Sequence, residues 1–204
     1  MFDWILPEDH AIAILKKDHD TVKGLFDEFK EAKTTAARTK IVDQALIELK
    51  LHAILEEEIF YPTVRAHVGR DIMNEADEEH HVAKVLIAEL DTVDAKNDHR
   101  DAKFTVLAES VRHHIREEEN EMLPKAKELD IDFQGLGQRM LARKKELLRD
   151  GIPSDAEHAM VAKSRGRVDS PAAAAARRKP AKTRKAPARG SSGRGSKRKS
   201  HAGR

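Results

Sequence analysis

The segments LHAILEEEIFYP, residues 51–62, and HHIREEENEMLP, residues 113–124, decide how this chain folds. Each contains a histidine, a glutamate four residues later and a proline ten residues after the histidine. These residues are His52, Glu56 and Pro62 in the first segment and His114, Glu118 and Pro124 in the second. Residues four apart lie on the same face of an α-helix. The segments therefore predict two copies of one helix, and each proline is expected to kink or end its helix.

The duplication extends to the helix that precedes each copy. The sequence HDTVKGLFDEF from His19 aligns with HHVAKVLIAEL from His80 at an offset of 61 residues, and the two later segments align at an offset of 62. The chain therefore contains two versions of one helical hairpin.

Apolar residues recur every three or four positions in four long runs, at 12–29, 42–59, 76–90 and 104–122. This period is that of an α-helix, and no stretch alternates with the period of a strand. Four helices with short connections predict an all-α, antiparallel up-down four-helix bundle built from a duplicated hairpin. A short fifth helix is expected at 136–148, packed over one end.

Histidine and glutamate occupy core positions of these helices. The residues concerned are His19, His52, Glu56, His80, His114 and Glu118. A single inward histidine is usually a core residue bonded to a backbone carbonyl, but six such residues in a repeated pattern favour a metal centre. Buried carboxylates need a positive partner, and a pair of transition-metal ions supplies it. Mixed imidazole and carboxylate ligands suit iron, manganese or zinc.

Two ligand assignments have close alternatives. His81 and His113 adjoin His80 and His114 and could replace them as ligands. We prefer His80 and His114 because they lie on the apolar stripes of their helices. The neighbouring acids Glu57, Glu58, Glu117 and Glu119 are expected to lie in solvent or beside the ligands.

The order His, His-x-x-x-Glu, His, His-x-x-x-Glu, together with the phrases LKKDHDTVKGLFDEF and HHIREEENEMLP, resembles the hemerythrin-like (HHE cation-binding) family over about residues 8–150. The resemblance implies a bundle that holds an oxo- or hydroxo-bridged non-haem di-iron centre. By this resemblance His19 and His52 would bind one iron, His80 and His114 the other, and Glu56 and Glu118 would bridge them. Members of the family bind O₂, sense iron, oxygen or redox state, or handle NO and peroxide.

One position departs from the oxygen-carrying hemerythrins, which have a second histidine one turn from the first on the third helix. Ala76 and Lys84 stand at those positions around His80. The resemblance then implies about five ligands for each iron and one open position. We expect a site that is more reactive, and less suited to reversible O₂ carriage, than that of the oxygen carriers.

A ferritin-like di-iron protein is the nearest rival with the same architecture. Such proteins carry Glu-x-x-His on two helices and a further Glu on each of the other two. Here Glu78-x-x-His81 occurs once, without a second copy on a matching core face. The pattern therefore favours the hemerythrin-like site.

Charge divides the chain into two parts. Residues 161–204 contain 15 of the 38 Lys and Arg residues but one of the 36 Asp and Glu residues, which leaves 23 bases and 35 acids in residues 1–160. Segment 153–204 is rich in Ala, Pro, Gly, Lys and Arg and is expected to be a disordered tail. Residues 1–152 then form the domain. The tail, through residues 163–204, could bind nucleic acid non-specifically, fold back on the acidic bundle, or simply aid solubility.

Composition excludes several classes of site and protein. The absence of cysteine excludes disulfide scaffolds, thiolate metal sites and cysteine nucleophiles. No apolar run reaches the length of a membrane helix, and the N-terminus lacks the features of a secretory signal, so a cytoplasmic protein without membrane contact is expected. By the family resemblance, its expected role is to bind or reduce O₂, NO or peroxide in sensing or detoxification, which includes a peroxide- or NO-reducing enzyme. The alternatives are iron storage or sensing, and a nucleic-acid-associated module.

Overall fold

The computed structural model describes residues 6–94, 97 and 99–168, and every regular element in these ranges is a helix. The long helices are α1 (Ala11–Glu31), α2 (Thr35–Leu55), α4 (Arg70–Thr92), α5 (Arg100–Glu117) and α7 (Phe133–Asp150). The shorter elements are the π-helical turns η1 (Glu56–Phe60) and η2 (Glu118–Met122) and the helices α3 (Tyr61–Val68), α6 (Leu123–Lys127) and α8 (Ala156–Val168). No helix in these ranges has the length and hydropathy needed to cross a membrane.

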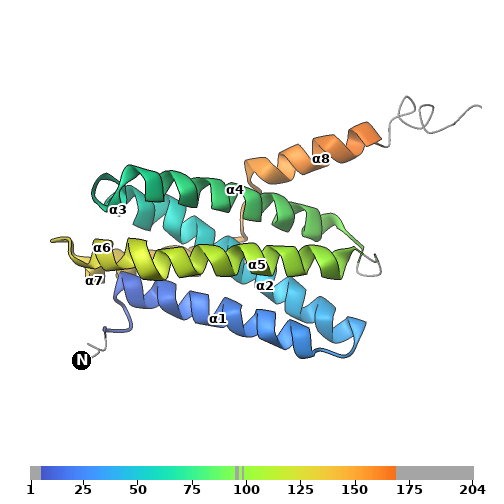
Figure 1. Ribbon diagram of the computed structural model, residues 1–204, viewed down its shortest axis with the longest axis horizontal. Coiled ribbons are helices and arrows are strands. Elements are labelled where there is room, and N and C mark those ends of the chain that lie inside the picture. The colour runs from blue at the N-terminus through green and yellow to red at the C-terminus, as the bar shows by residue number, and fades with distance from the viewer. Residues whose placement is uncertain (1–5, 95–96, 98, 169–204) are drawn as a thin grey trace, which may run out of the picture. The chain divides into compact units, whose positions relative to one another are not determined.

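Helices α1, α2, α4 and α5 form the antiparallel bundle that the apolar periodicity predicts (Figure 1). Helix α1 packs mainly against α2, and α4 packs mainly against α5, so each sequence repeat forms its own hairpin. The Thr34 side chain caps the start of α2 by accepting a hydrogen bond of 3.2 Å from the Ala37 N–H. Gly69 has a φ of 110°, a conformation that other residues rarely adopt, and it lets the chain turn from α3 into α4.

The two prolines of the repeat follow wide helical turns and end neither helix. In η1 the Tyr61 N–H bonds to the Glu56 carbonyl five residues earlier, and η2 begins in the same way at Glu118. Pro62 and Pro124 are the second residues of the α-helices that follow these turns. A proline lacks an N–H and crowds the carbonyl four residues back, which a wider preceding turn relieves. The helices therefore continue beyond both prolines as α3 and α6.

Two apolar clusters fill the bundle, one at each end. The first includes Leu15, Phe60 and Met122, and the second includes Phe26 and Phe104. Along each bundle helix, buried histidine or glutamate residues fall between the residues of the two clusters. The bundle thus has a polar layer between two apolar cores.

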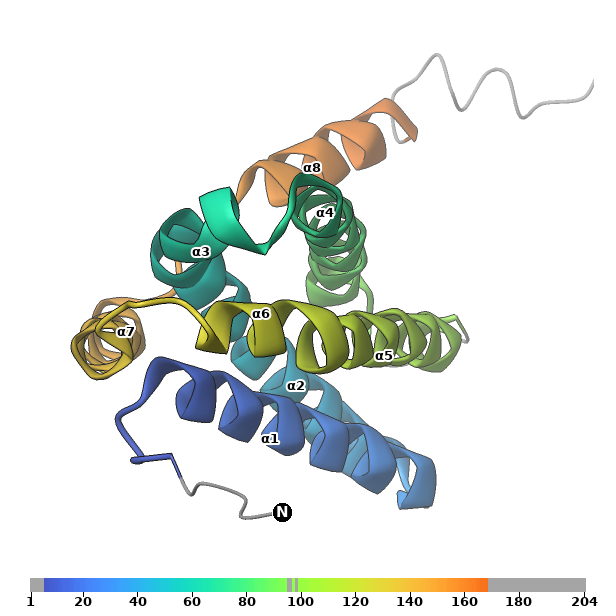
Figure 2. The ribbon, with the colours of Figure 1, turned by 60° about the vertical axis from the view of Figure 1, so that its left-hand side comes forward.

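Helix α7 is longer than the short fifth helix that the apolar pattern predicts. It has 18 residues, as many as α5, because the Asp132 side chain caps it early by accepting a hydrogen bond of 2.8 Å from the Gly135 N–H. It packs against α1 and α2 and adds to the first apolar cluster, over one end of the bundle as expected (Figure 2). Gly137 permits this approach, since a Cβ there would lie 2.0 Å from the Asp9 carbonyl oxygen.

The described part of the chain continues beyond residue 152 into a further helix, α8. Helix α8 occupies residues that composition assigned to the tail. His158 attaches it to α4: Nδ1 lies 2.6 Å from an Asp155 oxygen, and Nε2 lies 2.6 Å from an Asp91 oxygen. Contacts between residues that are far apart in the sequence cannot be predicted from composition. The remainder of the expected tail, residues 169–204, lies outside the described residues.

Candidate metal centre

The six residues predicted as metal ligands all lie in the polar layer, and all are buried. Helices α1 and α4 contribute one histidine each, while α2 with η1 and α5 with η2 contribute the two His–Glu pairs. Their exposed fractions are 1% for His19, 6% for His52, 0% for Glu56, 6% for His80, 7% for His114 and 1% for Glu118. The structure therefore brings all six together.

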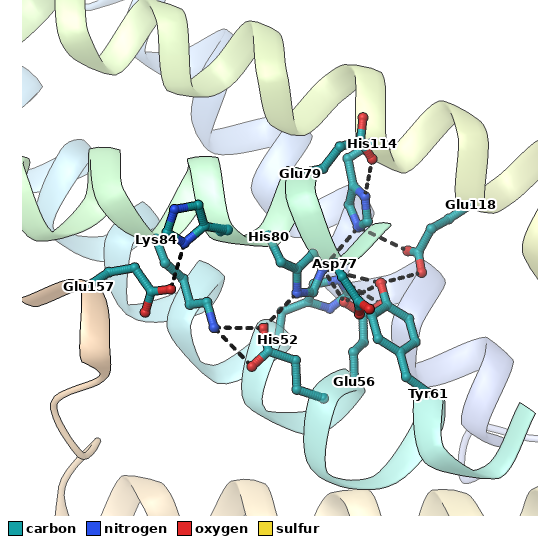
Figure 3. Close-up of polar contacts among 12 residues, drawn as sticks. His52, Glu56, Tyr61, Asp77, Glu79, His80, Lys84, His114, Glu118 and Glu157 are labelled. Carbon is teal, nitrogen blue, oxygen red and sulfur yellow. Dashed lines mark hydrogen bonds and ion pairs between the residues drawn. The ribbon is translucent and has the colours of Figure 1, made fainter. Parts of the chain in front are cut away.

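Glu56 presents one carboxylate oxygen to each half of the site (Figure 3). Its Oε1 lies 3.2 Å from His52 Nε2, and its Oε2 lies 3.3 Å from His80 Nε2. These histidines come from different sequence repeats. A carboxylate held in this way between two imidazoles has the arrangement of a bridging ligand.

Glu118 directs a single oxygen at the other two histidines. Its Oε2 lies 3.2 Å from His19 Nε2 and 3.6 Å from His114 Nε2. The four rings form two pairs, each within one hairpin, with centroids 4.8 Å apart for His19 and His52 and 4.7 Å apart for His80 and His114. Each hairpin therefore brings its own two imidazole rings together.

The centre of the layer holds buried polar atoms that no hydrogen bond satisfies. Among the described residues, His19 Nε2, His52 Nε2, Glu56 Oε1 and Glu118 Oε2 have no hydrogen-bond partner. Ligand atoms of these four residues lie within 4.8 Å of one another, and atoms of Glu56, His80 and His114 form a second such group. Buried imidazole and carboxylate atoms in this arrangement are unfavourable unless a cation joins them. The residues therefore fit two cations.

The pKa values of three buried residues show that this layer stabilises positive charge. Burial opposes protonation of His52, but the Glu56 and Asp18 carboxylates outweigh it and raise the pKa to about 10. Burial also opposes protonation of His80, whose carboxylate neighbours raise its pKa to about 9. For Glu56, burial favours the neutral acid, but the two histidines hold its pKa well below the ordinary value of 4.5.

A second carboxylate meets each histidine on the opposite edge of the ring. The contacts are His19 Nδ1 to Glu119 at 3.0 Å, His80 Nδ1 to Glu57 at 2.9 Å, His114 Nδ1 to Glu79 at 2.8 Å, and His52 Nδ1 to Asp18 at 3.9 Å. The first three are hydrogen bonds, while the fourth is too long for one. Carboxylates in this position orient imidazole ligands and raise their basicity. Each Nε2 is thereby aimed at the centre.

These outer acids follow the internal duplication. Asp18 and Glu79 directly precede the first histidine of each hairpin and reach the histidine of its second helix. Glu57 and Glu119 directly follow the buried glutamates and reach the first histidine of the other hairpin. Sequence reasoning considered the latter pair but missed Asp18 and Glu79. The sequence pattern that could have indicated these two acids is an acidic residue immediately before the first histidine of each hairpin.

Lysines in turn contact the outer acids. The distances are 3.3 Å from Lys23 Nζ to Glu119, 3.0 Å from Lys84 Nζ to Glu57 and 2.8 Å from Lys144 Nζ to Asp18. Lys23 and Lys84 occupy equivalent positions of the repeat, whereas Lys144 comes from α7. Because Lys84 is engaged in this way and Ala76 has no ligand atom, neither residue adds a ligand one turn from His80.

Tyr61 places a hydroxyl group at the centre of the site, which sequence reasoning did not foresee. Its oxygen donates to Glu118 Oε1 at 2.9 Å and lies 3.4 Å from Glu56 Oε2 and 3.1 Å from His80 Nε2. Burial, together with the two carboxylates, raises the pKa of Tyr61 well above 10, so the group remains a donor. One feature of the sequence could have indicated this role: the single tyrosine of the chain aligns with Leu123 in the other repeat.

The histidines considered as alternatives point outward. The side chain of His81 is 50% exposed and bonds to Glu157 of α8 at 2.9 Å. The side chain of His113 is 52% exposed and lies 3.1 Å from Glu117 and 3.7 Å from Glu79. Their buried neighbours, His80 and His114, therefore occupy the layer, in agreement with the apolar stripes.

A cavity of about 40 Å³ adjoins the histidines on the side of the second apolar cluster. All four imidazoles line it, and its apolar walls are Val22, Leu49, Ile87, Val111 and Ile115. A water-sized molecule needs about 10–15 Å³ of such space. The cavity is therefore of a size that admits a molecule of two or a few atoms.

Several known proteins are similar to this region in sequence or in fold. The chain is 28% identical over 142 residues to the uncharacterized protein Rv2633c of Mycobacterium tuberculosis, an alignment that covers 68% of this chain and 87% of the relative. It is 27% identical over 107 residues to a protein named DNA nickase from Nostoc sp., covering 52% of this chain and 30% of the nickase.

A solved structure and a family model agree with these relatives. The crystal structure of a hemerythrin HHE cation binding domain-containing protein, the Rv2633c homolog from Mycobacterium kansasii, matches with a TM-score of 0.58 and 26% identity, covering 67% of this chain and 86% of that one. The family model described as the hemerythrin HHE cation binding domain matches residues 10–126, a range that includes all six buried histidines and glutamates of the layer. The chain therefore belongs to the hemerythrin HHE cation-binding family.

Proposed function

We propose that the polar layer holds a non-haem di-iron centre and that the protein binds or reduces peroxide, NO or O₂. The observation that carries this proposal is the convergence of four imidazole Nε2 atoms on two buried carboxylates whose charge the described residues leave incompletely satisfied. Iron is the metal that the family resemblance implies, and the same ligands suit manganese or zinc.

The ring pairs and carboxylate contacts support one assignment of ligands. His19 and His52 would bind one iron, and His80 and His114 would bind the other. Glu56 and Glu118 would bridge the two irons: Glu56 presents one oxygen to each half of the site, and Glu118 presents its Oε2 to one histidine of each half. The outer carboxylates would hold each ring in place by accepting from Nδ1.

Two iron ions would supply the electrons for reducing a small oxidant. The protein's own residues shape the reaction around them. Tyr61 holds a proton beside Glu118 and can donate a hydrogen bond at the centre, and the small, partly apolar cavity beside the four imidazoles would receive the oxidant. Ala76 and Lys84 add no ligand near His80, which favours an open position and hence reduction of an oxidant over reversible O₂ carriage.

Four single-histidine variants test the metal assignment. Protein without a His-tag is reloaded with ferrous iron under anaerobic conditions, and its iron content is measured by elemental analysis. We expect about two irons per chain in the wild type, a sharp fall in His80→Ala and His114→Ala, and no change in their exposed neighbours His81→Ala and His113→Ala. Equal losses in the exposed and buried variants, or a wild type without iron, would contradict the site.

Reactivity of the loaded protein then distinguishes its roles. We expect the diferrous protein to consume peroxide or NO, measured by stopped-flow absorbance. A long-lived oxy complex that releases O₂ intact under vacuum would contradict the preference for reduction. If neither oxidant is consumed and chelation reversibly lowers the helix content measured by circular dichroism, iron storage or sensing is the better assignment.

Charge favours a second candidate function, association with nucleic acid. The 15 Lys and Arg residues of 161–204 against one acid would release counterions from a nucleic acid of any sequence. The name of the Nostoc relative also concerns DNA, although the alignment covers 30% of that protein. Binding through the tail and chemistry at the buried centre are compatible in one protein.

A further inference from the structure

A residue from outside the matched domain reaches the proposed centre. The family match ends at residue 126, whereas Lys144 lies on α7. Its Nζ lies 2.8 Å from Asp18 Oδ1 and 3.6 Å from Glu48. Asp18 is 8% exposed, so its buried charge needs positive neighbours, and this ammonium group is the one in hydrogen-bonding contact with it.

The contact with Lys144 determines where the other Asp18 oxygen points. Asp18 Oδ2 faces His52 Nδ1 at 3.9 Å, and neither atom has a hydrogen-bond partner among the described residues. In the other three rings the equivalent distance is 2.8–3.0 Å. Asp18 therefore faces His52, but at a longer distance than the other three acids have to their histidines. Because no hydrogen bond to His52 fixes the carboxylate, its orientation depends on the contact that Oδ1 makes with Lys144.

The two halves of the site differ at this point. Glu79, the repeat counterpart of Asp18, bonds directly to its histidine at 2.8 Å and has the half-exposed His113 on its other side. Glutamate is one methylene longer than aspartate and reaches its histidine unaided. The shorter Asp18 relies on a lysine that the sequence repeat does not supply.

Helix α7 presents this lysine from a firmly docked position. Arg143, the preceding residue, binds both oxygens of Glu58 at 2.8 and 3.1 Å. Near the other end of α7, Gln134 bonds to Asp9, and Gly137 allows close backbone packing. The lysine is thus held by a rigid element, which is what orienting a second side chain requires.

We infer that Lys144 is a positioning residue for the metal held by His19 and His52, because it fixes Asp18 so that this carboxylate can accept the His52 Nδ1 hydrogen. The inference rests on the proposed di-metal function. It makes α7 part of the metal centre and predicts that the two metal ions differ in how firmly they are held.

The experiment measures how fast each iron leaves the loaded full-length protein. Iron release to a ferrous chelator is followed by absorbance for the wild type, Lys144→Ala, Lys144→Met, Lys144→Arg and the control Lys145→Ala, whose side chain is exposed on the same helix. We expect one of the two irons to leave roughly 10–100-fold faster in Lys144→Ala and Lys144→Met, as for other outer-ligand changes. Lys144→Arg should restore slow release, and Lys145→Ala should behave as the wild type.

A structural role would give a different result. A general loss of stability would accelerate the release of both irons. Lys144→Ala and Lys144→Met leave the buried Asp18 without its lysine, so both should unfold at a lower temperature than the wild type when iron-free. Release is therefore measured where thermal unfolding shows every variant to be folded, and Lys144→Met retains most of the side-chain packing if Lys144→Ala folds poorly. Equal acceleration of both irons, or wild-type release in Lys144→Ala, would overturn this inference alone. A wild type that never holds two irons would overturn the proposed function, and the inference with it.

Discussion

At the scale of single residues, the internal symmetry of the site is incomplete, and each departure has a chemical consequence. Tyr61 replaces what is Leu123 in the other repeat and brings a hydroxyl group to the buried carboxylates. Lys144 has no counterpart in the repeat. A duplicated hairpin thus produces a centre whose two halves are electrostatically different.

The Tyr61→Phe variant tests the role of the hydroxyl group. The ring keeps its packing, but Glu118 Oε1 loses a buried donor at 2.9 Å. We expect the free energy of unfolding of the iron-free protein to fall by about 1–3 kcal/mol, the usual cost of leaving a buried acceptor unpaired. Urea denaturation measures this, and it should show a smaller loss after iron loading. Equal stability of the two iron-free proteins would contradict the prediction.

At the scale of elements, the wide turns and the added helices adjust how the bundle presents its ligands. The π-helical turns η1 and η2 begin at Glu56 and Glu118 and accommodate the prolines that follow. Helix α7 brings Lys144 to Asp18, the carboxylate that faces His52. Helix α8 attaches to α4 through His158, whose ring nitrogens contact Asp155 and Asp91.

This attachment of α8 should depend on pH. Burial opposes protonation of His158, but Asp91 and Asp155 outweigh it and raise its pKa above the ordinary 6.5. Protonated His158 therefore contributes its full stabilisation below pH 6.5, and the contribution is lost as the pH rises through the raised value. His81 also contacts Glu157 of α8, at 2.9 Å, and adds to the docking. Lys50 of α2 contacts the same Asp91 oxygen as His158, at 2.6 Å.

Amide hydrogen exchange in residues 156–163 measures this docking. After correction for intrinsic exchange rates, we expect less protection at pH 9 than at pH 6 in the wild type. The His158→Gln variant should have weaker protection with a smaller pH dependence. Protection that does not change with pH in the wild type, or that rises toward pH 9, would count against the histidine contact.

At the scale of the whole molecule, the uneven distribution of charge is the dominant feature. Residues 169–204 contain 12 of the 15 basic residues beyond position 160. The remainder of the chain is acidic and contains the candidate metal centre. The two properties can therefore be separated by a truncation that keeps α8.

The truncated chain 1–168 tests nucleic-acid binding. We expect the full-length protein to be retained on duplex DNA of random sequence at low salt and released between roughly 50 and 200 mM salt, because its binding depends on counterion release. The truncated chain should pass through while keeping its iron. Equal retention of both proteins would exclude the tail as the binding element.

Several features could be predicted from the sequence because they depend on local geometry. A spacing of four residues puts His52 beside Glu56 on one helix face, and the apolar period places His80 and His114 inward in preference to His81 and His113. The long bundle helices follow from the same period. The full length of α7 and the presence of α8 could not be predicted in this way, because a capping aspartate and a contact with α4 determine them.

The sequence by itself therefore determined the bundle, its duplication, the six inward residues and the basic tail, because helical periodicity and charge are properties of neighbouring residues. Only the tertiary structure decided which acid holds which histidine, that Tyr61 enters the centre, and that Lys144 reaches Asp18 across 126 positions of the chain. Those contacts join different helices. They depend on how the helices pack and on the turns between them, which no local pattern specifies.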